Sequence, residues 1–432
     1  MDSAVGTGAE EIVLRLLYQL IAILLTTRVV VAVVKRLGQT AVSGEILAGL
    51  LLGPSLLGAL APGLMRQLFH PSTSTIFVGI AQVGLVLLMF QIGLEFEFSE
   101  ILRTRKRAIA IISVLGMVAP FVLGLITAPF FYAELPAPLP PRLGFTLFFA
   151  IAMSITAIPI LGRIFMELRL SHTTTAALTI GAAAIDDVMG WLLLGVVGLV
   201  VREQFSAARF VLRIAGLALY LALIFGLVRP FLQRYIRGQL SRGPLQPPAV
   251  AALLLVLFAS ASITSNLGVF AIIGGFVIGV SLHSDRAFVA EWKARVSPLV
   301  NTLFLPVFFA YTGLRTDVGS LGDGRQLLLC AAVCAVAFLG KFGGAYAGAR
   351  LAGESNTSAL TIGACMNTRA LMELIALNIG YDLGVLPRTM FTKLVVMAIA
   401  STFMATPLIR RLMRGQERSA REPGPLQDAA VS

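Results

Sequence analysis

Short segments that carry Lys and Arg divide this chain into repeated apolar runs of about 20 residues. A run of that length spans the hydrocarbon core of a bilayer when it forms a helix, and in lipid only helices and closed barrels satisfy every backbone polar group internally. Hydrophobic residues occupy 57% of the 432 positions and charged residues only 13%. The helices of a soluble protein seldom run this long without a polar stripe. The pattern therefore predicts an all-α polytopic membrane protein.

We expect about thirteen spans in the chain. The pair 248–265 and 267–282 is the hardest to separate, because only Asn266-Leu267-Gly268 lies between its members. The expected ranges are 10–34, 41–61, 75–95, 108–132, 143–166, 173–201, 208–229, 248–265, 267–282, 297–314, 326–350, 357–380 and 390–411.

The net charge of +12 is concentrated in alternate loops, for example around 103–107 and 229–242. Such a bias marks the cytoplasmic side of a membrane protein and argues against a nucleic-acid partner. It predicts an outer N-terminus and a cytoplasmic C-terminus, in a cell (plasma) membrane that we take to be a bacterial inner membrane. The first apolar run is too long for a signal peptide and predicts a retained span. The three cysteines all lie in expected spans, which indicates neither a disulfide framework nor a zinc site.

Two adjacent carboxylates, Asp186 and Asp187, interrupt the apolar range 173–201. Each charge at membrane depth costs at least ~2.5 kcal/mol on insertion scales, so an ion or proton site is the first interpretation. Neighbours on a helix point about 100° apart, so one carboxylate can line a cavity while the other meets another helix. Lys341, well inside the range 326–350, is the expected partner, and Asp186 is the favoured acceptor. The alternatives are that both carboxylates are only salt-bridged or capping residues, and that Lys341 snorkels to an interface.

A helix break is expected within 143–166, at Thr156-Ala-Ile-Pro159. Pro159 cannot donate a backbone hydrogen bond and disfavours helix just before it, which exposes carbonyl groups near Thr156. Carbonyl, hydroxyl and carboxylate oxygens are the ligands that small hard cations prefer. A plain proline kink is the alternative.

Polar residues also interrupt the range 357–380, as Asn367-Thr368-Arg369 followed by Glu373. Arg369 and Glu373 are four residues apart and can pair on one helix face. Side chains of this kind balance the partial charges at the ends of half-helices. We expect these four residues to be mainly structural.

Several features recur seven spans apart. Gly49-x-x-x-Gly53 matches Gly275-x-x-x-Gly279, the Gly93-Leu94 end of one span matches Gly313-Leu314, and the break at 156–159 matches the one at 367–369. An odd offset reverses the orientation in the membrane, so the halves are expected to be inverted repeats. Transporters of this design bind substrate at midplane between broken helices.

Together these motifs resemble the monovalent cation:proton antiporters, specifically the second family of that superfamily, which includes bacterial sodium/proton and potassium/proton exchangers. The matching segments are 44–54, 88–95, 156–159, Asp186-Asp187, 306–309 with 313–315, Lys341, and 366–369 with 377–380. The resemblance implies the sodium/proton antiporter fold, with spans 5 and 12 as crossed discontinuous helices. It also implies that Asp187 binds the ion, that Asp186 pairs with Lys341, and that Thr156 contributes to the ion site. The family's usual Gly after the Asn-Thr-Arg run is Ala370 here.

The resemblance further implies a homodimer whose protomers each contain two domains. The dimerisation domain would comprise 1–107 (spans 1–3) and 248–325 (spans 8–10). The core domain would comprise 108–201 (spans 4–6) and 326–411 (spans 11–13). Span 7 and a cytoplasmic loop, 202–247, would link them, and 412–432 would form a short cytoplasmic tail that is too short for a nucleotide-binding domain.

The expected function is secondary antiport of a monovalent cation for protons, by alternating access, with Asp187 holding either a proton or the cation. Na⁺ is favoured and K⁺ is possible. No enzyme activity and no cofactor are expected, and the sequence contains no Gly-rich phosphate loop of the kind that ATP-driven transport requires. The alternatives are a non-transporting membrane sensor or regulatory subunit on the same fold, a K⁺-selective efflux system, a channel, and an organic-anion symporter.

Overall fold

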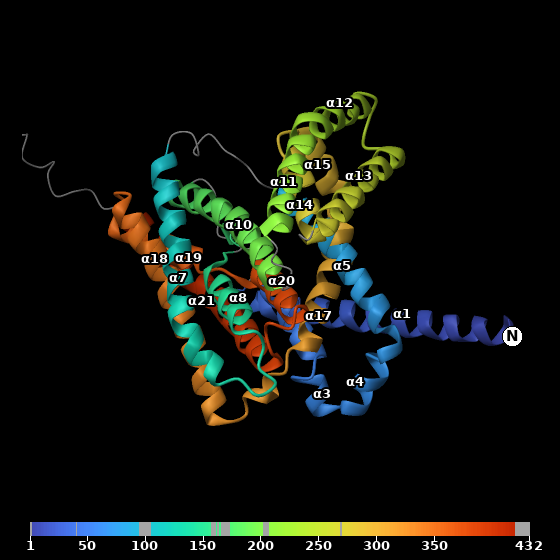
Figure 1. Cartoon of the computed structure of the whole chain (residues 1–432), viewed down its shortest axis with the longest axis horizontal. Helices are drawn as coiled ribbons and strands as arrows, with labels where there is room; N and C mark the ends of the chain where they lie inside the picture. The colour runs from blue at the N-terminus through green and yellow to red at the C-terminus, as the bar shows by residue number, and fades with distance from the viewer. Residues whose placement is uncertain are drawn as a thin grey trace, which may run out of the picture.

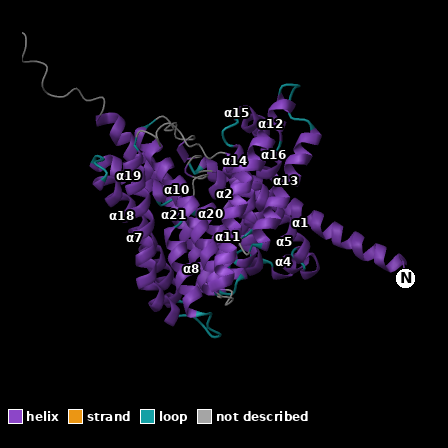
Figure 2. Ribbon diagram, turned by 45° about the horizontal axis from the view of Figure 1, so that its top comes forward, coloured by secondary structure: helices purple, strands orange, loops and turns teal. Residues whose placement is uncertain are grey.

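The structure is a computed structural model that describes residues 2–39, 41–94, 105–156, 161, 164–165, 173–201, 207–267 and 270–419. No strand occurs in these ranges, and helices make up nearly all of them (Figure 2). The elements are α1 (Asp2–Arg36), α2 (Ala41–Leu52), α3 (Leu57–Leu60), α4 (Pro62–Leu68), α5 (Pro71–Leu94), α7 (Lys106–Ala133), α8 (Arg142–Ser154), α10 (Thr174–Val201), α11 (Ala207–Leu223), η1 (Ile224–Val228), α12 (Arg229–Leu240), α13 (Pro247–Asn266), α14 (Ala271–Leu282), α15 (Arg286–Arg295), α16 (Ser297–Leu299), η2 (Val300–Phe304), α17 (Leu305–Arg315), η3 (Val318–Leu321), α18 (Gly324–Leu351), α19 (Asn356–Met366), α20 (Ala370–Asp382) and α21 (Arg388–Ser419).

Within the described ranges, ten helices are long and apolar enough to cross a membrane. They overlap ten of the expected spans. The other three expected ranges contain shorter helices: α8 in 143–166, α14 in 267–282, and the pair α19 and α20 in 357–380. The apolar blocks therefore predict where helices occur, and the three short cases are the places where a span is shortened or broken.

Two helices run further than the sequence predicts. The expected span 208–229 continues through η1 into α12 and ends at Leu240, where part of a loop was expected. This basic extension is held by packing against α14 and α15 and by an ion pair of 2.9 Å between Arg237 Nε and Asp285 Oδ2. At the other end of the chain α21 runs to Ser419, beyond the expected boundary at 411.

Figure 1 shows two groups of helices. One group contains α7, α8, α10, α18, α19 and α21, and the other contains α1, α5 and α11 to α15. Helices α17 and α20 lie between the groups, at the centre of the molecule, and α1 extends away from it. Each group collects helices from both halves of the chain.

Glycines bring pairs of helices together at the positions of the internal repeat. A Cβ on Gly49 of α2, or on Gly53 just after it, would collide with the carbonyl oxygens of Phe309 and Gly313 in α17. In the matching arrangement, a Cβ on Gly279 of α14 would collide with the carbonyl oxygen of Phe90 in α5. Small residues thus let two pairs of backbones touch, as they commonly do between membrane helices. The pairs α2–α17 and α5–α14 exchange under the seven-span offset, as expected for inverted repeats.

The first group is built around α7 and α18, which are also equivalent under that offset. Gly340, Gly344 and Gly348 of α18 lie against the backbone of α7, where a Cβ on Gly344 would come 2.5 Å from the carbonyl oxygen of Leu115. This close seam brings the inner faces of α7 and α18 to the same depth. It places Ser113 of α7 and Lys341 of α18 around the middle of α10.

Candidate ion site

Two interrupted helices meet in the middle of the first group. Helix α8 ends at Ser154, and Ile155 is extended, with φ −70° and ψ 144°. Helix α19 ends at Met366, and the chain leaves the helical conformation until α20 begins at Ala370. The hydroxyl of Thr156 lies 3.2 Å from the carbonyl oxygen of Met366, which joins the two breaks. Both expected breaks are thus present, although Pro159 itself lies outside the described residues.

Arg369 satisfies the carbonyl groups that the first break exposes. Its guanidinium donates to the carbonyl oxygens of Ala152 and Met153, both at 2.8 Å, and to that of Ala337 at 2.9 Å. The C-terminal end of a helix carries partial negative charge, so a buried cation is stabilising there. Arg369 also forms the expected i,i+4 ion pair with Glu373, at 3.6 Å.

The two other members of the polar run 367–369 are buried with it. Thr368 donates its hydroxyl to the carbonyl of Cys365 at 2.8 Å, which closes the end of α19. Asn367 Oδ1 lies 3.4 Å from Arg369 Nε. These contacts support the structural role that the sequence suggested for the run.

Asp186 is held by three side chains, one from α7, one from α18 and one from the break after α8. Lys341 Nζ lies 2.7 Å from Asp186 Oδ2 and also donates to the carbonyl of Ser154. Ser113 donates its hydroxyl to Asp186 Oδ1 at 2.6 Å, and the Thr156 hydroxyl lies 3.3 Å from Asp186 Oδ2. The expected Lys341–Asp186 ion pair is therefore present. Asp186 faces α7 and α18 in the interior of the group.

Asp187 points to a different place, as the angle between helical neighbours predicts. It is 1% exposed and lines a small cavity of about 10 Å³ together with Ile155, Gly190 and Met372. Lys341 interacts electrostatically with Asp187 as well as with Asp186. Because Ile155 begins the break after α8 and Met372 lies in the first turn of α20, the cavity is located where both broken helices approach α10.

The charges of the five ionisable side chains that the structure describes at this crossing do not sum to zero. Asp186, Asp187 and Glu373 are acidic, Lys341 and Arg369 are basic, and each of the five is at most 1% exposed. With every group ionised, the cluster has a net formal charge of −1. An uncompensated charge is costly in a buried environment. One proton or one monovalent cation would neutralise the cluster, whereas a divalent cation would overshoot.

The sequence singled out the polar residues that meet here, but it did not identify the residues that surround them. Asp186, Asp187, Thr156, Lys341 and the run 367–373 come together as described above. No recognisable sequence pattern marks Ser113, Ile155, Gly190 or Met372, since each is an ordinary residue of an apolar stretch.

The hydroxyl of Thr156 lies in a different place from the one expected. The hydroxyl of Thr156 lies beside Asp186 and the Met366 carbonyl, whereas the residue next to it, Ile155, lines the Asp187 cavity. Among the described residues no group of three or more His, Cys, Asp or Glu side chains is arranged to hold a metal ion. Oxygen atoms at the crossing are the ligand type that suits an alkali cation.

Comparisons with known proteins agree with this arrangement. Residues 21–415 match the family model described as "Sodium/hydrogen exchanger, transmembrane". The chain is 34% identical over 400 residues to the Na(+)/H(+) antiporter NhaS4 of Synechocystis, covering 92% of this chain and 97% of the relative. It is 34% identical to the Cation/H(+) antiporter 17 of Arabidopsis thaliana and 29% identical to the K(+)/H(+) antiporter 1 of Saccharomyces cerevisiae. It covers 91% of its own length in both cases, but only 48% and 46% of those longer relatives.

The fold is also found among solved structures. The sodium proton antiporter MjNhaP1 from Methanocaldococcus jannaschii superimposes with a TM-score of 0.58 at 15% sequence identity, over 95% of this chain and 99% of that one. At this identity the match establishes the fold. The family model and the cyanobacterial relative, which match almost the whole chain, establish the family. The chain is a multi-pass membrane protein that belongs to the sodium/hydrogen exchanger family.

Proposed function

We propose that this protein is a secondary antiporter that exchanges a monovalent cation for protons across a cell membrane, with Asp187 as the shared site. The observation that carries the proposal is the net formal charge of −1 in the buried cluster at the crossing of the broken helices. A single proton and a single Na⁺ or K⁺ neutralise that charge equally well, so each can displace the other. Na⁺ is our favoured substrate and K⁺ the second candidate.

Exclusive occupancy of one carboxylate gives exchange if only the neutralised states cross the membrane. An uncompensated buried charge disfavours movement of the empty site, because it would be carried past an apolar surface. In the roles that we propose, Asp186 and Lys341 form the fixed pair that holds α10 against α18, and Thr156 braces the break. Arg369, Glu373, Asn367 and Thr368 keep the crossed helices in register.

The two groups of helices suggest which parts move. We propose that 108–201 and 326–411 form a mobile core domain that carries the site, and that 1–107 and 248–325 form the dimerisation domain of a homodimer. The segment 202–247 would link them. The bias of Lys and Arg between loops supports a cytoplasmic C-terminus in a bacterial inner membrane.

Replacing the shared carboxylate tests the proposal directly. Purified Asp187→Asn protein, reconstituted in proteoliposomes with an internal pH dye, is expected to show no proton flux when Na⁺ or K⁺ is added outside. The amide is similar in size but cannot exchange a proton for a cation. Glu11→Gln, which makes the same change at an exposed carboxylate of α1, is the matched control and should retain wild-type flux.

Three results would contradict the proposal. Full exchange in Asp187→Asn would place the shared site elsewhere. Conductance of cations without proton movement in the wild type would indicate a channel. A wild-type protein that binds cations but moves neither ion would indicate a sensor on the same fold.

A further inference from the structure

The cavity beside Asp187 is very small, and the carboxylate that lines it is buried. Its volume of about 10 Å³ is close to the minimum that a single water molecule requires. A cation that reaches Asp187 in this conformation must therefore lose its hydration shell. Of the four lining residues that the structure describes, Ile155, Gly190 and Met372 offer no charged group, so these walls limit the space and Asp187 supplies the attraction.

Gly190 has no side chain and so leaves this space open, although no close contact with the described backbone requires a glycine there. At Gly49 or Gly279 a Cβ would collide with a backbone carbonyl, so those positions require glycine. At Gly190 a Cβ would lie 3.4 Å from Ile155 Cγ1, which is a van der Waals contact, and no other atom of the described residues lies within 4 Å. Glycine inside a helix is less favourable than alanine. The missing methyl group thus has a stability cost, and what it provides is room next to Asp187.

We propose that Gly190, together with Ile155, determines which monovalent cation Asp187 accepts, by setting the size of this cavity. Gly190 lies one helical turn after Asp187, on the same face of α10, so a side chain there projects beside the carboxylate. Selectivity between hard cations depends on cavity size and on the number and flexibility of the ligands. A smaller cavity excludes K⁺ before it excludes Na⁺ or Li⁺, and a larger cavity does the reverse. This inference rests on the proposed function for its transport readout.

Two substitutions change the cavity in opposite directions. Gly190→Ala adds one methyl group and should raise the apparent KM for K⁺, relative to that for Na⁺ and Li⁺, by about tenfold or more, as one methyl group does in a tight pocket. Ile155→Val removes one methyl group and should shift the same ratio toward K⁺. Gly343→Ala is the matched control, because it places a Cβ on α18 where no atom lies within 4 Å. Its ratio should equal that of the wild type.

The same variants are tested by binding, so that the result does not depend on transport. Thermal unfolding of each purified protein is followed with LiCl, NaCl or KCl, with choline chloride as the reference, since a ligand of the native state raises the unfolding temperature. In Gly190→Ala, Li⁺ should raise the unfolding temperature more, relative to K⁺, than it does in the wild type. In Ile155→Val, K⁺ should raise it more, relative to Li⁺, than it does in the wild type. If the wild type transports no ions but the variants still show these shifts in cation binding, only the exchange function is overturned. Unchanged cation orders in both variants, in folded protein that still binds cations, would overturn the inference.

Discussion

Asp186 and Asp187 are adjacent in sequence but lie in very different surroundings. Asp186 is fixed by Lys341, Ser113 and Thr156, from three elements, whereas Asp187 lines the cavity where the broken helices approach α10. A carboxylate that accepts several charge-assisted hydrogen bonds is held in one orientation. The two carboxylates therefore differ in role: Asp186 positions its neighbours, and Asp187 is the proposed exchanging group. Two equivalent ion ligands would have similar surroundings.

Ser113 is the partner of Asp186 that sequence reasoning missed, and it can be tested at the level of a single hydroxyl. A hydrogen bond to a charged group contributes about 1.5–3 kcal/mol. Ser113→Ala removes this donor from the ionised Asp186 carboxylate, so a proton competes more strongly for Asp186, and the Asp186–Lys341 pair that positions the site forms only at higher pH. Exchange should reach half of its maximum about one pH unit higher than in the wild type, measured as cation-driven proton flux across a pH series.

The control removes a hydroxyl group from another position of the same helix. Thr127→Val removes a hydroxyl of α7 that donates to the Leu123 carbonyl, away from the site, and should leave the pH profile unchanged. Ser113→Thr keeps the donor and should restore most of the wild-type profile. If Ser113→Ala and Thr127→Val have the same profile, Ser113 is only a packing residue.

Among the elements, the long helices followed directly from the sequence. The range 108–132 was expected and α7 runs over Lys106–Ala133, because uninterrupted apolar composition determines such a span. The broken helices were located through Pro159 and Asn367, yet α8 ends at Ser154, several residues before the proline. That boundary depends on Lys341 and Arg369, which lie in other elements and donate hydrogen bonds to the exposed carbonyls. The cavity wall formed by Ile155, Gly190 and Met372 depends on three elements at once, so no local pattern could reveal it.

The glycine contacts between helices carry a stability prediction. A Cβ on Gly313 of α17 would collide with the backbone of Gly49 in α2, and a backbone cannot rotate away. Gly313→Ala should therefore destabilise the protein by about 1–3 kcal/mol, which is typical of overpacking, and should lower the temperature of thermal unfolding in detergent. Gly79→Ala, on α5 with no atom within 4 Å, is the control and should unfold at or slightly above the wild-type temperature. Equal unfolding temperatures for the two variants would show that α2 and α17 separate easily.

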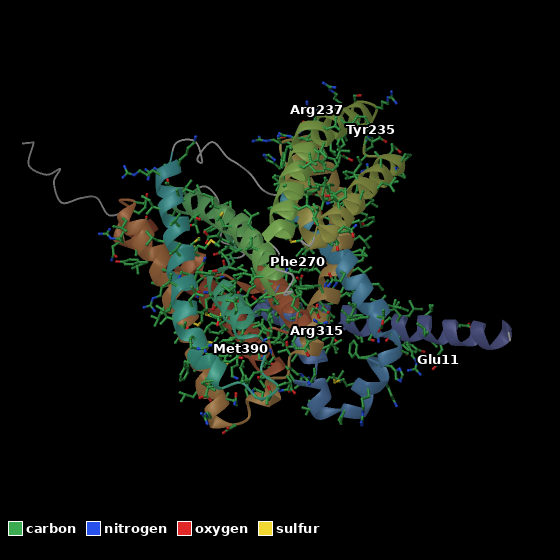
Figure 3. The ribbon with its side chains drawn as sticks, viewed as in Figure 1. Glu11, Tyr235, Arg237, Phe270, Arg315 and Met390 are labelled. Atoms are coloured by element: carbon green, nitrogen blue, oxygen red, sulfur yellow. The ribbon has the colours of Figure 1, made fainter. Side chains whose placement is uncertain are left out.

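For the whole molecule, the contacts between the two groups of helices decide how it can move. At the C-terminal ends of α17 and α20, Arg315 Nη1 lies 2.6 Å from Asp382 Oδ1, and Asn378 Nδ2 donates to Thr312 Oγ1 at 2.8 Å. Figure 3 shows Arg315 at the centre of the molecule, on the boundary between the groups. The Arg315 and Asp382 side chains are 20% and 43% exposed, and a pair of this kind contributes only about 0–1 kcal/mol. Such contacts can hold one conformation and still break in every transport cycle.

A reversible cross-link between α17 and α20 tests whether these contacts must break. In a background with Cys330, Cys334 and Cys365 replaced by alanine, the pair Thr312→Cys and Asn378→Cys is oxidised in proteoliposomes. Cross-linking should stop exchange, and reduction should restore it, because the proposed core domain can no longer move against the proposed dimerisation domain.

The control cross-link joins two helices of the same group. Gln19 Nε2 donates to Thr73 Oγ1 at 2.7 Å, which links α1 to the start of α5. Oxidation of the pair Gln19→Cys and Thr73→Cys should leave exchange unchanged, as should each single cysteine variant. If fully cross-linked Thr312→Cys/Asn378→Cys protein still exchanges ions at the rate of its reduced form, α17 and α20 move as one body. The boundary between the moving parts would then have to lie elsewhere, and the division of the chain at 325–326 would be wrong.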